Sequence, residues 1–373
     1  MDKLNAPFRY DIVGSFLRPE AIKTARAQYV QGQITLDRLR DVEDVEVAKL
    51  IERQKAAGLH AVTDGEFRRR WWHLDFLAGF NGIEVYDFET DGFGVKKMMQ
   101  STYVSEPLSF DPAHPFLEGF KRTQEIAGDV PVKQTIAGPN MITLDSVVLS
   151  AQYAANPVYR DLDELREALA KVYQDAIKAF YDAGCRYLQL DDTSWGALFS
   201  KRFRDRITAC GYDPDKLIDV FGDITEAALE GRPSDMVITT HMCKGNFMSH
   251  WLYEGTYETV ARRLLGIRGI DGFFLEYDDE RSGDFSPLRF LPKDTDQRVV
   301  LGLVTTKDPK LEDAAPIRDR IYEAAKVVDL DRLCLSPQCG FSSTEEGNVL
   351  SEEDQWKKLR LVREVAESVW ADA

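Results

Sequence analysis

The sequence predicts a (β/α)8 TIM barrel, an α/β fold, from three observations. Short apolar runs rich in β-forming residues alternate with longer helical patterns. About eight such pairs follow one another, which is the number that this barrel requires. No linker rich in Gly, Ser or Pro divides the chain. We therefore expect a single barrel domain over residues 1–373.

The expected elements follow from local patterns. Helical spacing of apolar residues predicts helices such as 36–57. The pattern Ser351-x-x-Asp354 is typical of a capping box and predicts the start of a C-terminal helix. The eight expected strands are residues 10–15, 60–65, 130–136, 186–191, 236–241, 272–277, 298–304 and 332–336.

Residues 81–110 are the exception to this alternation. Apolar and polar residues alternate on both sides of the turn-like run TDGFG at residues 90–94. This pattern predicts a β-hairpin inserted after the second strand. A doubly wound open sheet is the main alternative fold, because alternation of strands and helices does not by itself prove that a sheet closes.

The composition narrows the class of partner. A formal net charge of -16 opposes nonspecific binding to nucleic acid or to an anionic membrane surface. The start of the chain has no signal-peptide pattern, and no run approaches the roughly 20 apolar residues of a membrane span. Five irregularly spaced cysteines do not make a disulfide framework. We expect a cytoplasmic protein with reduced thiols and small-molecule substrates, and assembly into a homo-oligomer stays open.

Four residues at the ends of expected strands are candidate metal ligands. His241 and Cys243 are two apart, so both can point into a barrel mouth from the end of one strand. Glu276 ends an apolar strand, where a buried carboxylate needs a cation. Cys339 lies in a turn beyond the last strand. An imidazole, two thiolates and a carboxylate favour tetrahedral Zn²⁺.

The donor set indicates a particular chemistry. Two thiolates and a carboxylate make an anionic zinc site, which suits activation of a substrate thiol for alkyl transfer better than hydrolysis. Two alternatives remain at this point. Buried His and Cys are common for packing reasons alone, and a closed zinc site can serve stability only.

Seven segments together resemble a known family. The chain resembles the C-terminal catalytic barrel of cobalamin-independent methionine synthase, in a single-barrel form. The resemblance runs in order from about residue 10 to residue 345. It rests on the segments IVGSFLRP, TDGEFRR, TIAGPNMI, LQLDD, THMCKGNF, FFLEYDD and LSPQCGF.

The resemblance implies a reaction and a site. The family transfers a methyl group from methyltetrahydrofolate to homocysteine bound on zinc. Its zinc ligands match the four candidates above, and its amino-acid subsite matches Ser15, Glu66 and Asp191. Paired carboxylates suit an ammonium group. Competing interpretations are a helix N-cap role for Asp192 and a surface ion-pair network of Glu66 with the arginines at 68–70.

The chain also departs from the family pattern. We expect it to lack the N-terminal half that helps to bind polyglutamyl folate in the full-length family. Lys307 stands where the family has a histidine that protonates the departing pterin, and Thr193 replaces a usual proline. We therefore treat Lys307 and Asp192 as candidate catalytic residues for the proton on the leaving group.

The expected function is a zinc-dependent methyltransferase that activates a thiol, homocysteine, as a zinc-bound thiolate to form methionine. Methyltetrahydrofolate or a similar compound is the expected donor. The alternatives are a related zinc alkyltransferase that uses methylcobalamin, or coenzyme M with an epoxide, a metal-independent barrel of the decarboxylase type, and a noncatalytic zinc or redox protein.

Overall fold

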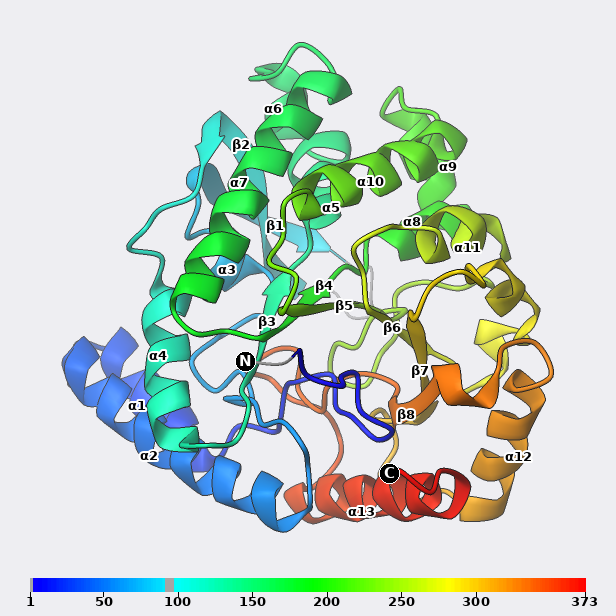
Figure 1. Cartoon of the computed structure of the whole chain (residues 1–373). Coiled ribbons are helices and arrows are strands. Elements are labelled where there is room, and N and C mark those ends of the chain that lie inside the picture. The colour runs from blue at the N-terminus through cyan, green and yellow to red at the C-terminus, as the bar shows by residue number, and fades with distance from the viewer. Residues whose placement is uncertain (1–2, 91–96) are drawn as a thin grey trace.

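Six parallel strands follow one another around the centre of the computed structural model, with helices outside them (Figure 1). The structure describes residues 3–90 and 97–373. The strand order is β3-β4-β5-β6-β7-β8, without the reversal that marks a doubly wound sheet. The strands are β3 Lys133–Ala137, β4 Tyr187–Asp191, β5 Val237–Met242, β6 Gly272–Glu276, β7 Arg298–Val304 and β8 Leu333–Pro337.

Two N-terminal segments join the edges of this sheet. Tyr10 forms a parallel bridge to Leu335 in β8, and Val62 forms one to Val132, just before β3. A hydrogen bond from the Phe16 N–H to a carbonyl of the second segment links the two segments to each other. The predicted parallel α/β fold is confirmed, and its six regular strands neighbour one another in the predicted order. Each of the six lies within three residues of its predicted limits.

The first two predicted strands, 10–15 and 60–65, form only these single bridges. Beyond the backbone hydrogen bonds of these bridges, side chains bond to their backbone groups. The Gln54 side chain donates to the Thr63 carbonyl at 2.8 Å and accepts from the Thr63 N–H at 3.0 Å. Thr63 in turn donates to the Gly14 carbonyl at 2.6 Å. Gly14 has a φ of 153°, and a Cβ there would lie 2.7 Å from Thr135.

The helices lie around the strands (Figure 1). Ser351 and Asp354 form the predicted capping box of the last helix. The predicted helix 36–57 is confirmed as α2. The helices are α1 Glu20–Val30, α2 Leu36–Ala56, α3 Leu74–Leu77, α4 Pro115–Ala127, α5 Pro139–Met141, α6 Ala151–Ala155, α7 Leu162–Asp182, α8 Trp195–Phe199, α9 Lys201–Ala209, α10 Pro214–Leu229, α11 Glu258–Leu265, α12 Ala314–Ala324 and α13 Glu352–Val369. Four further segments are the π-helix η1 Ile142–Val148 and the 3-10 helices η2 Glu280–Ser282, η3 Ser286–Phe290 and η4 Leu330–Arg332.

The predicted hairpin is present after the second N-terminal segment. Its strands are β1 Asn81–Thr90 and β2 Lys97–Ser109, which pair antiparallel. The Thr102 hydroxyl is hydrogen-bonded to the Ser146 hydroxyl of η1 at 2.6 Å, and Val104 is fully buried. The hairpin is thereby anchored over the η1 segment. The turn predicted at residues 90–94 falls largely outside the described residues.

No helix in the described ranges combines the length and the apolar character that a membrane crossing needs. This result agrees with the absence of a long apolar run in the sequence.

Candidate metal centre and substrate pocket

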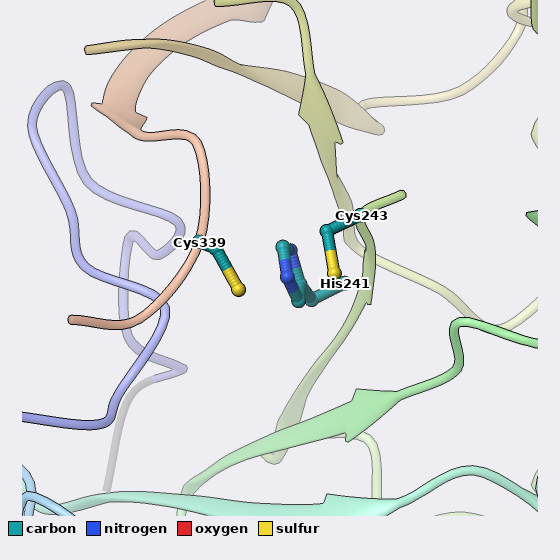
Figure 2. Close-up of side chains that lie close together, drawn as sticks. All are labelled: His241, Cys243 and Cys339. Carbon is teal, nitrogen blue, oxygen red and sulfur yellow. The ribbon is translucent and has the colours of Figure 1, made fainter. Parts of the chain in front are cut away.

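Three of the four predicted ligands converge at the C-terminal ends of the strands. His241 lies on β5, and Cys243 is the first residue after that strand. Cys339 lies two residues beyond β8. Their ligand atoms all lie within 4.8 Å of one another, and all three side chains are buried. Figure 2 shows them facing one another from two strand ends. The strand period explains the first pair, because residues two apart share a side.

The imidazole of His241 supports a metal at this position. Both of its ring nitrogens are buried, and neither has a hydrogen-bond partner among the described residues. Buried polar atoms rarely stay unpaired, so a missing ligand is the simplest explanation. Contact between the two sulfurs lowers the pKa of Cys339 well below its usual range and raises that of Cys243. One imidazole and two sulfurs are donors that suit zinc.

Glu276, the predicted fourth ligand, does not join this cluster. It is the last residue of β6 and fully buried. Its Oε1 accepts hydrogen bonds from Lys307 Nζ at 3.1 Å and from Arg281 Nη2 at 3.2 Å. Its Oε2 accepts the Lys244 N–H at 2.8 Å. Neighbouring cations and an amide therefore satisfy the carboxylate, and neither oxygen belongs to the group of mutually close ligand atoms.

A pocket opens over the three clustered residues. Its wall also carries the three residues that the family resemblance implies for the amino-acid subsite, Ser15, Glu66 and Asp191. Ser15 Oγ accepts the Ser342 N–H at 3.3 Å. A Cβ atom on residue 340 would lie only 1.9 Å from this oxygen, and Gly340 has none. The close approach of these two loops therefore requires glycine at position 340.

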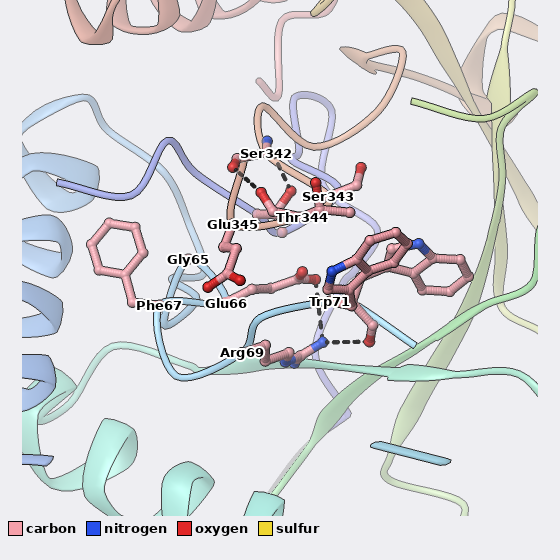
Figure 3. A network of polar contacts seen from close by, with 12 residues as sticks. Gly65, Glu66, Phe67, Arg69, Trp71, Ser342, Ser343, Thr344 and Glu345 are labelled. Atoms are coloured by element: carbon pink, nitrogen blue, oxygen red, sulfur yellow. Dashed lines mark hydrogen bonds and ion pairs between the residues drawn. The ribbon is translucent and has the colours of Figure 1, made fainter. Parts of the chain in front are cut away.

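Glu66 is buried beside the pocket in an unusual backbone conformation, with a φ of 60°. Its Oε1 accepts the Thr135 hydroxyl at 3.1 Å and lies 3.3 Å from Arg69 Nη1. Its Oε2 is buried and accepts no hydrogen bond from the described residues. Burial raises the pKa of this carboxyl. Glu66 is thus ion-paired, but inside the pocket wall rather than in a surface network (Figure 3).

Asp191 is the last residue of β4 and is paired in register with His241. Its Oδ1 accepts a hydrogen bond from Gln189 Nε2 at 2.7 Å. Burial raises the pKa of the carboxyl to about 7. Asp191 and Glu66 therefore present two acidic groups to the same pocket, and a bound cation would stabilise the ionised form of both.

The two predicted proton-handling residues lie elsewhere. Neither Lys307 nor Asp192 is among the described residues that line the pocket. Lys307 faces Glu276 and Asp278. Asp192 accepts hydrogen bonds from Asn140, at 2.9 Å, and from Ser194, so its carboxylate links β4 to neighbouring turns. The geometry gives neither residue direct access to a molecule in the pocket.

Sequence reasoning missed one carboxyl group, and it favoured a core role over a pocket role for Trp71 and Trp72. Asp145 lines the pocket from η1, and burial raises its pKa to about 7. An acidic residue inside the apolar run MITLDSVV could have pointed to it, because such a carboxyl is costly to bury. Aromatic residues of the hairpin, of α9 and of neighbouring loops also line the pocket, among them Trp71, Trp72, Tyr86, Phe88, Phe203 and Tyr253.

The fold and the site define a parallel α/β barrel with a metal-type donor cluster in its pocket. The sequence model of the family described as "Cobalamin-independent synthase, Catalytic domain" matches residues 10–368. The chain therefore belongs to the cobalamin-independent methionine synthase family, as the motifs predicted.

The chain is similar to several known proteins along nearly its whole length. It is 47% identical to "Uncharacterized protein YxjH" of Bacillus subtilis (strain 168), covering 98% of this chain and 95% of that protein. A Listeria monocytogenes structure described as "Putative Vitamin-B12 Independent Methionine Synthase" superposes with a TM-score of 0.77 at 40% identity, covering 98% of both chains.

Similarity to named methyltransferases is lower and partial. The 5-methyltetrahydropteroyltriglutamate–homocysteine methyltransferase of Trichodesmium erythraeum is 22% identical to the chain, which covers only 40% of that protein. Family membership is therefore shown, whereas the substrates of this chain are a matter for proposal.

Proposed function

We propose that this chain is a zinc-dependent methyltransferase that transfers a methyl group to the sulfur of homocysteine and so forms methionine. The observation that carries the proposal is the convergence of His241, Cys243 and Cys339 in one pocket, with both imidazole nitrogens free of other partners among the described residues. Zn²⁺ bound by these residues would supply the positive charge that keeps a substrate thiol ionised at neutral pH.

Residues of the pocket wall beside the cluster would bind the amino-acid part of the substrate. Glu66 and Asp191 carry buried carboxyl groups, and burial raises the pKa of both. An ammonium group between them would compensate their cost of ionisation. Ser15 supplies a hydroxyl donor for the substrate carboxylate. Because both acidic residues lie near the cluster, an amino thiol fits this pocket better than a sulfonate such as coenzyme M.

The outer part of the pocket would receive the methyl donor. Its aromatic lining includes Trp71, Trp72, Tyr86 and Phe88. Such side chains offer flat apolar surfaces for a conjugated ring system. This lining supports a donor of the methyltetrahydrofolate type.

The transfer forms a sulfur–carbon bond as the bond between carbon and the leaving nitrogen breaks, and the nitrogen then takes up a proton. Asp145 lines the pocket and has a pKa of about 7, so its carboxyl group carries a proton in part of the molecules at neutral pH. We assign this proton transfer to Asp145 Oδ. Lys307 and Asp192, the residues predicted for this step, do not line the pocket.

The test is to load the purified chain with zinc, add homocysteine, and compare methyltetrahydrofolate, its polyglutamate form and methylcobalamin as donors. We expect methionine from methyltetrahydrofolate, quantified by mass spectrometry. Methionine from methylcobalamin alone would move the chain to the related alkyltransferase class. Absence of methionine with every donor, or full activity of a zinc-free Cys243→Ala variant, would overturn the proposal.

A further inference from the structure

Helix α9 concentrates positive charge in a strongly acidic chain. Four of its nine residues, KRFRDRITA, are Lys or Arg and one is acidic, whereas the whole chain has a formal net charge of -16. Two of the four basic residues, Arg202 and Arg206, line the pocket. They are four positions apart, so they lie on the same side of the helix. A local patch of positive charge at a pocket attracts anionic ligands.

The other two basic residues of α9 have acidic partners. Lys201 forms an ion pair with Asp205 at 2.7 Å, and Arg204 forms one with Asp215 at 2.7 Å. Arg204 also donates a hydrogen bond to the Leu198 carbonyl at 2.8 Å, which ties α9 to α8. None of these residues is among the described residues that line the pocket. The helix therefore balances its charges away from the pocket.

Phe203 fixes α9 against the pocket wall. It is buried, and its ring packs edge-on against Tyr253, with 4.8 Å between the ring centroids. Both rings line the pocket. The guanidinium carbon of Arg202 lies 5.8 Å from the centre of the Phe203 ring. Because Arg202 and Arg206 are exposed to solvent, they lie at the outer end of the pocket, beside its aromatic lining.

Arg206 has an acidic neighbour in the pocket but forms no ion pair with any residue in the described ranges. The neighbour is Asp145. Burial raises the pKa of Asp145 to about 7, and the charge of Arg206 opposes this rise. Glu66 has its own cation, since its Oε1 lies 3.3 Å from Arg69 Nη1. The acidic groups of the pocket thus leave the Arg206 guanidinium available to a ligand.

An anion at α9 is expected to belong to the second substrate. In the proposed function, the charged ends of homocysteine are bound by Ser15, Glu66 and Asp191, and its sulfur lies at the metal cluster. The pocket continues beyond these groups to the hairpin and to α9. Guanidinium groups bind carboxylates through paired, charge-assisted hydrogen bonds. A methyl donor with a flat ring system and a carboxylate-bearing end matches this outer part.

We propose that Arg202 and Arg206 form a subsite for the carboxylate-bearing end of the methyl donor, so that the chain selects an acidic donor. The two arginines are specificity-determining residues and take no part in bond making or breaking. This inference rests on the proposed function, because it concerns the second substrate of the same pocket.

The first experiment measures binding by calorimetry with the zinc-loaded chain, without any assay of turnover. The probes are 5-methyltetrahydrofolate and its dimethyl ester, which keeps the ring system but has no carboxylate. The unchanged chain should bind the acid at least about 10-fold more tightly than the ester. Equal binding of the two probes, or binding of neither, would overturn the inference.

Variants of α9 assign this preference to particular residues. Arg206→Met should weaken binding of the acid roughly 3- to 30-fold and change binding of the ester by less than about 2-fold. Arg206→Lys keeps the charge and should retain most of the affinity. Lys201→Met is the matched control, because it removes the same charge from the same helix outside the pocket lining. An equal loss from Lys201→Met and Arg206→Met would refute the subsite.

The second experiment uses salt. Raising NaCl from about 50 mM to about 500 mM should weaken binding of the acid to the unchanged chain, because salt screens exposed charges. The double variant Arg202→Met/Arg206→Met should lose most of this salt dependence, while its zinc content and its KM for homocysteine stay the same. An undiminished salt dependence in the double variant would count against the inference. Circular dichroism checks that each variant is folded, and the comparison of acid with ester in the unchanged chain needs no variant.

Failure of the inference and failure of the proposed function give different results. If the double variant makes methionine from methyltetrahydrofolate with an unchanged KM, the function stands and the subsite is refuted. If the chain prefers the acid to the ester through Arg206 but makes no methionine with any donor, the subsite stands and the proposed function fails.

Discussion

The two sides of the pocket are built in different ways. On the metal side, His241 and Cys243 come from the end of a regular strand, and hydrogen bonds to the neighbouring strand fix its register. On the opposite side, Ser15 and Glu66 come from segments that form only single bridges. Side-chain hydrogen bonds of Gln54 and Thr63 hold those segments. Ladder hydrogen bonds thus position His241 and Cys243, and also Asp191 at the end of β4. Individual side chains hold the segments that carry Ser15 and Glu66.

The largest expected effect is on the metal side. Cys339→Ala should remove stoichiometric zinc and lower turnover at least about 100-fold, because a thiolate donor is lost from the cluster. The matched control is Cys210→Ala, since Cys210 is an exposed free cysteine far along the chain from the cluster. Zinc is measured by mass spectrometry of the dialysed protein. Equal zinc content in the two variants would show that the metal side does not hold a metal.

The next effect is on the scaffold of the opposite side. Gln54→Leu keeps the size of the side chain but leaves the N–H and the carbonyl of Thr63 without partners. Each unsatisfied buried group costs about 1–3 kcal/mol, so the free energy of unfolding should fall by roughly 2–6 kcal/mol. The exposed Gln33→Leu is the control. Urea unfolding measures both, and a change below about 0.5 kcal/mol for Gln54→Leu would contradict the comparison.

The chemistry of the opposite side can be separated from metal binding. Glu66→Gln should raise the KM for homocysteine roughly 10- to 100-fold, because a charge-assisted hydrogen bond to the substrate ammonium is lost. Zinc content should not change. Glu43→Gln is the control, since Glu43 is also buried and ion-paired to arginine but does not line the pocket. Loss of zinc from Glu66→Gln would mean that the two sides are not independent.

This contrast explains what the sequence could predict. The period of two along a strand places His241 beside Cys243, and the parallel order places Cys339 at the same mouth, so local patterns were sufficient. The bonding of Glu276 was not predictable, because it depends on cations contributed by other loops, Arg281 and Lys307. The course of residues 60–65 is held by Gln54, and Thr63 connects it to Gly14, contacts that no local pattern predicts.

The pH dependence of the transfer step tests the role of Asp145. Burial raises the pKa of Asp145 from 3.8 to about 7, so its carboxyl group is protonated below that pH and ionised above it. At saturating homocysteine, kcat should fall as the pH rises through about 7. Asp145→Asn should lower kcat and abolish this decline. Asp192→Asn is the comparison variant, and loss of the decline there instead would restore the role predicted for Asp192.

The same shift predicts a change in stability. A carboxyl group whose folded-state pKa is raised stabilises the fold fully below its unfolded pKa of about 3.8 and loses that contribution as the pH rises to about 7. The Asp145→Asn variant does not lose stability in this way, because asparagine does not ionise. Its stability relative to the unchanged chain should therefore increase between pH 4 and pH 7, as measured by thermal unfolding at both values.

The smallest expected effect concerns the hairpin, which contributes residues of β1 and β2 to the pocket lining. Phe88 lines the pocket, whereas Val85 on the same strand is 42% exposed and does not. Phe88→Ala should raise the KM for the methyl donor about 2- to 10-fold, through the loss of an aromatic contact. Zinc content and the KM for homocysteine should stay the same, and Val85→Ala should change none of these values. A rise in the KM for homocysteine instead would place the hairpin over the amino-acid subsite, and the donor would then have to enter from another direction.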